Sequence, residues 1–94
     1  MTTLSSKKQK ENEEKLKKAV TTLQSVADSN ITPRNIRKIV KDTIMVLQGA
    51  QDSVGVKAAN AISMLDEVSQ DPNMPSFARV TIWSAVSNLE SIRE

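Results

Sequence analysis

The sequence predicts an all-α protein, a four-helix bundle built from two repeated helical hairpins. Apolar residues recur every three or four positions in four separate windows, which is the helical period. Only two aromatic residues occur, Phe77 and Trp83, and no window alternates apolar with polar residues as a strand would. The chain of 94 residues is long enough for one domain, so we expect residues 1–94 to form a single four-helix domain.

The first helix is expected to begin near Ser6 or Lys7 and to end near Asp28. Its apolar face consists of Leu16, Ala19, Val20, Leu23, Val26 and Ala27. The preceding segment KKQKENEEK has no apolar side chain to bury. Because most helical stability comes from packing an apolar face, we expect this end to fray and residues 1–6 to form a flexible tail.

The second helix is expected after the segment DSNITP. Thr32 is predicted as its N-cap, with Pro33 at the first helical position, where the missing N–H costs nothing. The helix is expected to run to about Leu47 and to be closed by Gly49. Its inward positions are Ile36, Ile39, Val40, Ile44 and Leu47.

The third and fourth helices are expected on either side of the segment SQDPNMP. Asp52 or Ser53 caps the third helix, whose apolar positions are Val54, Ala58, Ala61, Ile62, Leu65 and Val68. Pro75 opens the fourth helix, which is expected to bury Phe77, Ala78, Ile82, Val86, Leu89 and Ile92. Three methionines are expected to fill gaps in the core, namely Met45, Met64 and Met74.

An internal repeat supports the two-hairpin architecture. When residues 10–52 are aligned without gaps on residues 52–94, seven positions are identical: Lys15/Lys57, Ala19/Ala61, Leu23/Leu65, Val26/Val68, Pro33/Pro75, Arg37/Arg79 and Leu47/Leu89. Unrelated sequences would share roughly two to three, at about 6% per position. The matches fall on the inward face, the loop proline and one arginine. We therefore expect the hairpins, residues 10–51 and 52–94, to close face to face as an up-and-down bundle with an approximate two-fold axis.

The two repeated arginines are predicted to hold loops. Arg37 and Arg79 each lie one turn into a helix that follows a loop with an aspartate, Asp28 or Asp71. We expect each arginine to tie its loop to its own hairpin, through that carboxylate or through loop carbonyls. The alternative is an arginine that faces outward toward a ligand.

Two stretches resemble a known family. From ITPRNIRKIVKD through AANAISMLDEVSQDPNMPSFARVTIW to the C-terminus, the chain resembles a small uncharacterised protein family of archaea over roughly residues 20–94. The resemblance implies an all-helical fold similar to the bromodomain-like four-helix bundles. It implies no activity, cofactor, partner or binding residue.

The composition argues against catalysis. The chain has neither histidine nor cysteine, so the commonest general base, the commonest metal ligand and the thiolate are all missing. Asp66, Glu67 and Asp71 form the best acidic cluster, but Asp66 and Glu67 are neighbours that point to different faces of a helix. There is no Gly-rich phosphate loop and no G-x-S-x-G motif. We therefore expect no enzyme, no cofactor and no metal site.

The hydropathy pattern predicts a cytoplasmic protein without a membrane segment. No apolar run approaches the roughly 18 residues of a transmembrane helix, and the N-terminus lacks a signal-peptide core.

The leading functional hypothesis is a non-enzymatic helical protein-interaction module. Its partner would be another protein or a second copy of the chain, giving a homo-oligomer. Trp83 aligns with Lys41 in the repeat, at the border of the core, where a tryptophan either extends the core or meets a partner. Phe77 aligns with Asn35. Phe77 and Trp83 are the candidate contact residues.

The alternative hypothesis is weak, sequence-independent binding of nucleic acid. Arg34, Arg37, Lys38 and Lys41 are spaced as one stripe along the second helix, and such a stripe would follow phosphates. The net charge of +2 permits this function without requiring it. A solubilising face is the simpler interpretation, and no aromatic residue interleaves with the stripe to stack on bases.

Overall fold

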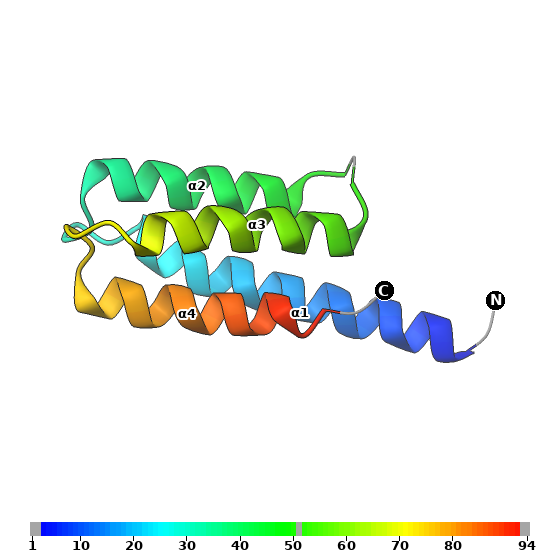
Figure 1. The fold of residues 1–94 in the computed structure, drawn as a ribbon. Helices are drawn as coiled ribbons and strands as arrows, with labels where there is room; N and C mark the ends of the chain where they lie inside the picture. Colours follow the sequence, from blue (N-terminus) through cyan, green and yellow to red (C-terminus); the bar gives the residue numbers. More distant parts are fainter. Residues whose placement is uncertain (1–2, 51, 93–94) are drawn as a thin grey trace.

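Four α-helices account for most of the described chain (Figure 1). The structure, a computed structural model, describes residues 3–50 and 52–92, and the side chains of residues 7–50 and 52–92. The helices are α1 (Thr3–Ala27), α2 (Arg34–Gln48), α3 (Val54–Ser69) and α4 (Ser76–Glu90). No residue within these ranges is in a strand, which confirms the predicted all-α class.

The helices form an up-and-down bundle, as predicted. Consecutive helices run in opposite directions, and α1 and α3 each pack against both α2 and α4. In addition, α1 approaches α3 across the bundle, whereas among the described residues no Cα atom of α2 lies within 8 Å of one in α4. Figure 1 shows the α1–α2 and α3–α4 loops together at one end. The α2–α3 connection lies at the other end, where the N-terminal part of α1 extends beyond the rest of the bundle.

One apolar core runs between the four helices. Leu23 and Leu65, which correspond in the repeat, are both completely buried. The predicted inward positions are buried or pack against the core in every helix, with the single exception of Phe77. The helical spacing of apolar residues therefore predicted the interior correctly at the other positions.

Phe77 and Met45 are corrections to the predicted core. Phe77 is 38% exposed and Met45 is 69% exposed. Each is the immediate neighbour of an inward residue, Ala78 or Ile44, and adjacent residues of a helix are turned about 100° apart. Of the other methionines, Met74 is buried as expected, at 5% exposure.

The two loops at the same end of the bundle have matching backbones. Pro33 has φ −55° and ψ 148°, and Pro75 has φ −62° and ψ 149°. The N–H of Arg37 donates to the carbonyl of Pro33 at 2.9 Å, and the N–H of Arg79 donates to that of Pro75 at 3.1 Å. The sequence repeat is therefore also a repeat of local structure.

The predicted N-cap of α2 is wrong by one residue. Pro33 itself is the N-cap, because its ψ lies outside the helical region and helical geometry begins at Arg34. Pro75 has the same role before α4. Thr32 caps nothing, and its Oγ1 is buried without a hydrogen-bond partner.

The remaining helix ends follow the predictions more closely. Ser53 is the N-cap of α3, and its side chain accepts a bond from the N–H of Val56 at 3.3 Å. Gly49 closes α2 as expected, but with the extended backbone φ −66°, ψ 154° rather than a left-handed one. α1 begins at Thr3, earlier than the expected Ser6 or Lys7. The predicted tail of residues 1–6 falls partly on residues 1–2, which lie outside the described residues.

Candidate functional site

The candidate contact surface is the outer face of α4. We define this face by its exposed residues Ser76, Phe77, Val80, Trp83, Ser84 and Ser87. Val80 is 63% exposed, Trp83 58% and Phe77 38%. Because side chains three and four positions apart are neighbours on a helix, these three apolar groups share one side of α4. Phe77 and Trp83 were predicted for this role, and Val80 was not.

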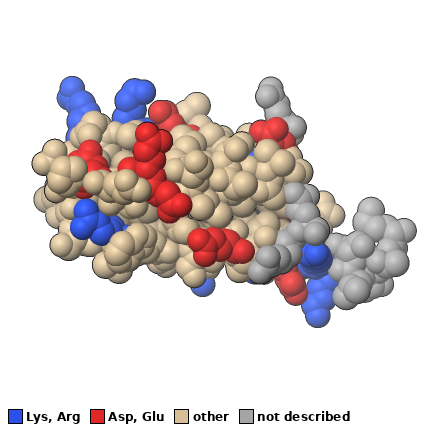
Figure 2. Space-filling view, viewed as in Figure 1, with Lys and Arg blue, Asp and Glu red and all other residues tan. Residues whose placement is uncertain are grey.

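The outer face of α4 carries no charge. The charged residues of α4 are Arg79 and Glu90, and neither belongs to this face. Arg79 is half-buried against a loop, and Glu90 is the last residue of the helix. In Figure 2 the surface along α4 is mostly uncharged, whereas Lys and Arg side chains project from the edge over α2. The result is an uncharged, partly apolar helix face, whereas the other large exposed apolar side chains, Ile31, Met45 and Val56, lie singly on different elements.

The repeat supplies an internal comparison for this surface. The positions of α2 that correspond to the outer face of α4 are Arg34, Asn35, Lys38, Lys41, Asp42 and Met45. Five of these six are polar or charged, although the two helices have equivalent places in the bundle. A charged outer surface is therefore compatible with this architecture. The apolar residues of α4 are not explained by the needs of the bundle.

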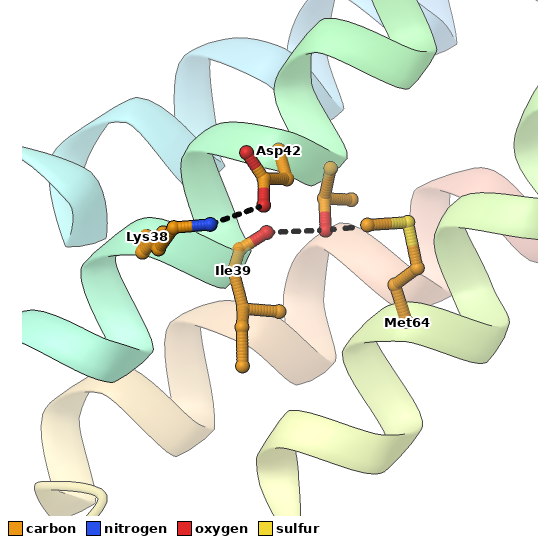
Figure 3. A network of polar contacts seen from close by, with 5 residues as sticks. Lys38, Ile39, Asp42 and Met64 are labelled. Carbon is orange, nitrogen blue, oxygen red and sulfur yellow. Dashed lines mark hydrogen bonds and ion pairs between the residues drawn. The ribbon is translucent and has the colours of Figure 1, made fainter.

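The predicted basic stripe on α2 is only partly assembled. Arg34, Lys38 and Lys41 are exposed, but Arg37 is half-buried. Lys38 Nζ lies 3.6 Å from Asp42 Oδ2 on the same helix, so part of the positive charge is neutralised locally (Figure 3). Two exposed basic side chains without such a contact, Arg34 and Lys41, lie about two helical turns apart.

Arg79 holds its loop as predicted. Its Nε donates to the carbonyl of Ser69 and its Nη2 donates to the carbonyl of Asp71, both at 3.3 Å. The carboxylate of Asp71 does not pair with Arg79. It accepts instead from Asn35 Nδ2 at 3.1 Å and from the N–H of Asn73 at 2.8 Å. The partners of the arginine are therefore backbone carbonyls, one at the end of α3 and one in the loop, and not the carboxylate of Asp71.

Arg37 does not reproduce this arrangement. Its Nε is buried without a hydrogen-bond partner. Asp28, the expected partner, accepts from Gln24 Nε2 at 3.0 Å. The prediction that Arg37 holds its loop through a hydrogen bond to Asp28 or a loop carbonyl is therefore wrong for its Nε, although Arg37 corresponds to Arg79 in the repeat.

The two arginines give a testable difference in stability. We expect Arg79→Ala to lower the free energy of unfolding by about 1–2 kcal/mol, because it leaves the backbone carbonyls of Ser69 and Asp71 without their charged donor. Arg37→Ala should cost less than about 0.5 kcal/mol, apart from lost packing of its alkyl stem. Urea denaturation of both variants measures the difference. Equal losses would show that the bonds of Arg79 contribute nothing beyond packing.

The one fully buried hydroxyl near the middle of α2 is structural. Thr43 has no exposed surface, and its Oγ1 lies 2.8 Å from the carbonyl oxygen of Ile39 and 3.8 Å from Met64 Sδ. Figure 3 shows Met64 reaching from α3 toward α2 at this point. A hydroxyl that bonds the carbonyl four residues earlier is satisfied within its own helix. It offers no activated nucleophile.

The acidic cluster does not assemble either. Asp66 and Glu67 are exposed at the end of α3, and Asp71 is engaged by Asn35 and Asn73. Within residues 3–50 and 52–92 no group of three or more His, Cys, Asp or Glu residues is placed to hold a metal ion.

Among the described helices, none is both long enough and apolar enough to cross a membrane.

Fold and surface together define a small all-helical bundle with one partly apolar outer helix face. The chain belongs to an uncharacterised protein family (UPF0147), whose family model matches residues 3–92. This confirms the archaeal family inferred from the sequence. The family has no assigned function.

Similar proteins cover nearly the whole chain. UPF0147 proteins of Metallosphaera sedula and Sulfurisphaera tokodaii are 51% and 46% identical over 84 residues, covering 89% of this chain and 94% of each relative. The UPF0147 protein of Desulfurococcus amylolyticus is 42% identical and is covered to 92%. A crystal structure of the unknown function protein MMP1188 is 38% identical, with a TM-score of 0.82 over 85% of this chain and 91% of that one.

Proposed function

We propose that the protein is a non-enzymatic helical interaction module that binds a partner protein through the outer face of α4. The observation that carries this proposal is the exposure of Phe77, Val80 and Trp83 on one uncharged side of the helix. Contiguous exposed apolar side chains mark interaction surfaces more often than scattered ones do, and tryptophan is enriched among residues that dominate binding energy. The chain has no histidine or cysteine for acid–base or thiolate chemistry.

The expected partner surface is apolar at its centre. An uncharged helix face offers little Coulomb attraction, so affinity would come from removing the rings of Phe77 and Trp83 from water. The hydroxyls of Ser76, Ser84 and Ser87 flank these rings and keep the face soluble when it is free. A partner helix that presents aliphatic side chains three and four positions apart would match this arrangement.

Trp83→Ser should abolish capture of the partner without destabilising the bundle. Because Trp83 is 58% exposed, the substitution is expected to change the free energy of unfolding by no more than about 0.5 kcal/mol. Affinity capture from an extract of the native cell, with the wild-type chain as bait, identifies the partner by mass spectrometry. The matched control is Met45→Ser, which removes a 69% exposed apolar side chain from α2.

The outcomes separate the face of α4 from general stickiness. Loss of one partner with Trp83→Ser, but not with Met45→Ser, supports the proposal. Equal retention by all three baits would reject it. Light scattering over a concentration series shows whether that partner is a second copy, because the wild type would then gain mass and Trp83→Ser would not.

Nucleic-acid binding through α2 has weaker support. Arg37 is half-buried and Lys38 is paired with Asp42, which leaves few free charges for phosphates. Titration with duplex DNA at ~50 mM salt is the counter-test, because phosphate contacts are strongest at low salt. Binding that weakened with salt and with Lys41→Gln would favour this alternative over the interaction module.

A further inference from the structure

We infer that the face buried between the two hairpins is a self-complementary interface, which accepts the hairpin of a second copy of this chain by exchange. Hairpin 1 is α1 with α2, and hairpin 2 is α3 with α4. This interface is distinct from the outer face of α4, so the inference does not depend on the proposed function.

The pattern of helix neighbours is that of a two-fold interface. Interchanging the hairpins turns the α1–α4 contact into the α3–α2 contact, and both contacts are present. The same interchange leaves the α1–α3 contact unchanged, because it only exchanges the two helices. A contact that lies on a two-fold axis behaves in this way. A two-fold interface brings each surface patch against its own equivalent, so that residue i meets j and residue j meets i.

Two lysines make this reciprocity explicit at the level of atoms. Lys15 Nζ of hairpin 1 donates to the carbonyl of Ser91 of hairpin 2 at 2.9 Å. Lys57 Nζ of hairpin 2 donates to the carbonyl of Gly49 of hairpin 1, also at 2.9 Å. Lys15 corresponds to Lys57 and Gly49 to Ser91 in the repeat. Each bond places a cation at the C-terminal end of a helix, where the helix dipole favours it.

The core residues follow the same rule. Ala19 and Ala61 are both completely buried, and so are Leu23 and Leu65. Val40 and Ile82, which also correspond, have no exposed surface either. Neither hairpin can cover this face alone, and hairpin 2 of another copy offers the same contacts as hairpin 2 of the same chain.

The covalent link between the hairpins is short and already extended at both ends. Gly49 has φ −66° and ψ 154°, and Ser53 has φ −66° and ψ 160°. Both end residues therefore already have the extended backbone angles that a straightened connection would use. When a hinge is too short to reverse the chain, exchange between copies is a low-cost route to a dimer.

Deletion of residues 49–52 tests the inference in the otherwise intact chain. Only Ser53 then joins α2 to α3, so that Gln48 and Val54 lie at most about 7.6 Å apart, two Cα steps. Antiparallel helix pairs are joined by loops of about two to five residues, so one chain cannot easily close its own bundle through a single residue. We expect twice the wild-type mass by light scattering, with wild-type helix content per residue by circular dichroism. The matched control, Gly-Ser-Gly-Ser inserted after Ala50, should be a folded monomer.

Two further measurements distinguish hairpin exchange from association through the outer face of α4 and from a failure to fold. Adding Trp83→Ser to the deletion should leave the dimer intact, whereas loss of the dimer would assign it to the outer face of α4 and reject the exchange. If the deletion variant does not fold, exchange is tested instead in a chain with the full α2–α3 connection. Two batches of Met45→Cys/Trp83→Ser, labelled with donor and acceptor dyes, are unfolded together and refolded at high concentration, so that association through the outer face of α4 does not contribute. Energy transfer in a dimer-sized fraction supports the inference, and its absence overturns it, as does a folded monomer of the deletion variant.

Discussion

Leu65→Ala is expected to lower the free energy of unfolding by about 2–5 kcal/mol, the usual range for removing a leucine from a packed core. Leu65 has no exposed surface and lies in α3, which packs against α2 and α4 and meets α1. Neighbours on several sides prevent the helix from collapsing into the space that the missing methyl groups leave. Small domains are stable by only about 5–15 kcal/mol, so this single change removes a large share. Chemical denaturation followed by circular dichroism measures it.

The equivalent substitution in hairpin 1 is the appropriate partner experiment. Leu23 is also completely buried and corresponds to Leu65, so Leu23→Ala should cost the same to within about 1 kcal/mol. Met45→Ala, at a 69% exposed position, should change stability by no more than about 0.5 kcal/mol. A Leu23→Ala cost near that of the Met45→Ala control would mean that the two halves of the core are not energetically equivalent.

The interior could be predicted because two independent signals agree on it. Helical spacing selects Leu23 and Leu65 as inward residues, and the repeat matches them to each other. Positions under the same packing constraint in two hairpins tolerate few side chains, whereas exposed positions tolerate many. The identities therefore concentrate where the structure buries them.

Helix ends could be predicted only to within a residue. Thr32 and Pro33 form an ordinary capping pair in sequence, and the choice between them depends on ψ at Pro33, which the sequence does not determine. The position of Gly49 was predicted, but its backbone was not, because glycine adopts either sign of φ at little cost.

The candidate contact surface could be predicted in part. The sequence left Trp83 at the border of the core, because a small rotation of α4 about its axis decides between burial and exposure. Val80 was overlooked, although its alignment with the charged Lys38 already indicated a solvent-facing position. Comparing corresponding residues of the two hairpins would have identified an outer face that is charged in one and apolar in the other.

The arginines show what a sequence repeat cannot specify. Identity at positions 37 and 79 correctly predicts matching backbone positions, each one turn after a capping proline. It does not specify the hydrogen bonds of the guanidinium group. Arg79 donates to the carbonyls of Ser69 and Asp71, whereas the Nε of Arg37 has no hydrogen-bond partner. The lysines at positions 15 and 57 show the opposite case, because their identity reflects the same bond made twice.

Ala61→Leu is expected to lower the free energy of unfolding by about 1–3 kcal/mol, because it adds side-chain volume to a filled core. Ala61 in α3 and Ala19 in α1 are both completely buried, on the two helices that meet across the bundle. A larger side chain must push these helices apart or leave its preferred rotamer. Since the contact lies on the approximate two-fold axis, Ala19→Leu should have a similar effect, measured by the same denaturation experiment.

Ala59→Leu is the matched control, because it makes the same chemical change at an exposed position of the same helix. Alanine and leucine are both strong helix formers, so the control should stay within about 0.5 kcal/mol of the wild type. The double variant Ala19→Leu/Ala61→Leu should deviate from the sum of the single effects by about 0.5–3 kcal/mol if the two side chains compete for one space. Strict additivity would show that α1 and α3 accommodate the two changes independently, and that the small side chains at positions 19 and 61 are not what sets the separation of the two helices.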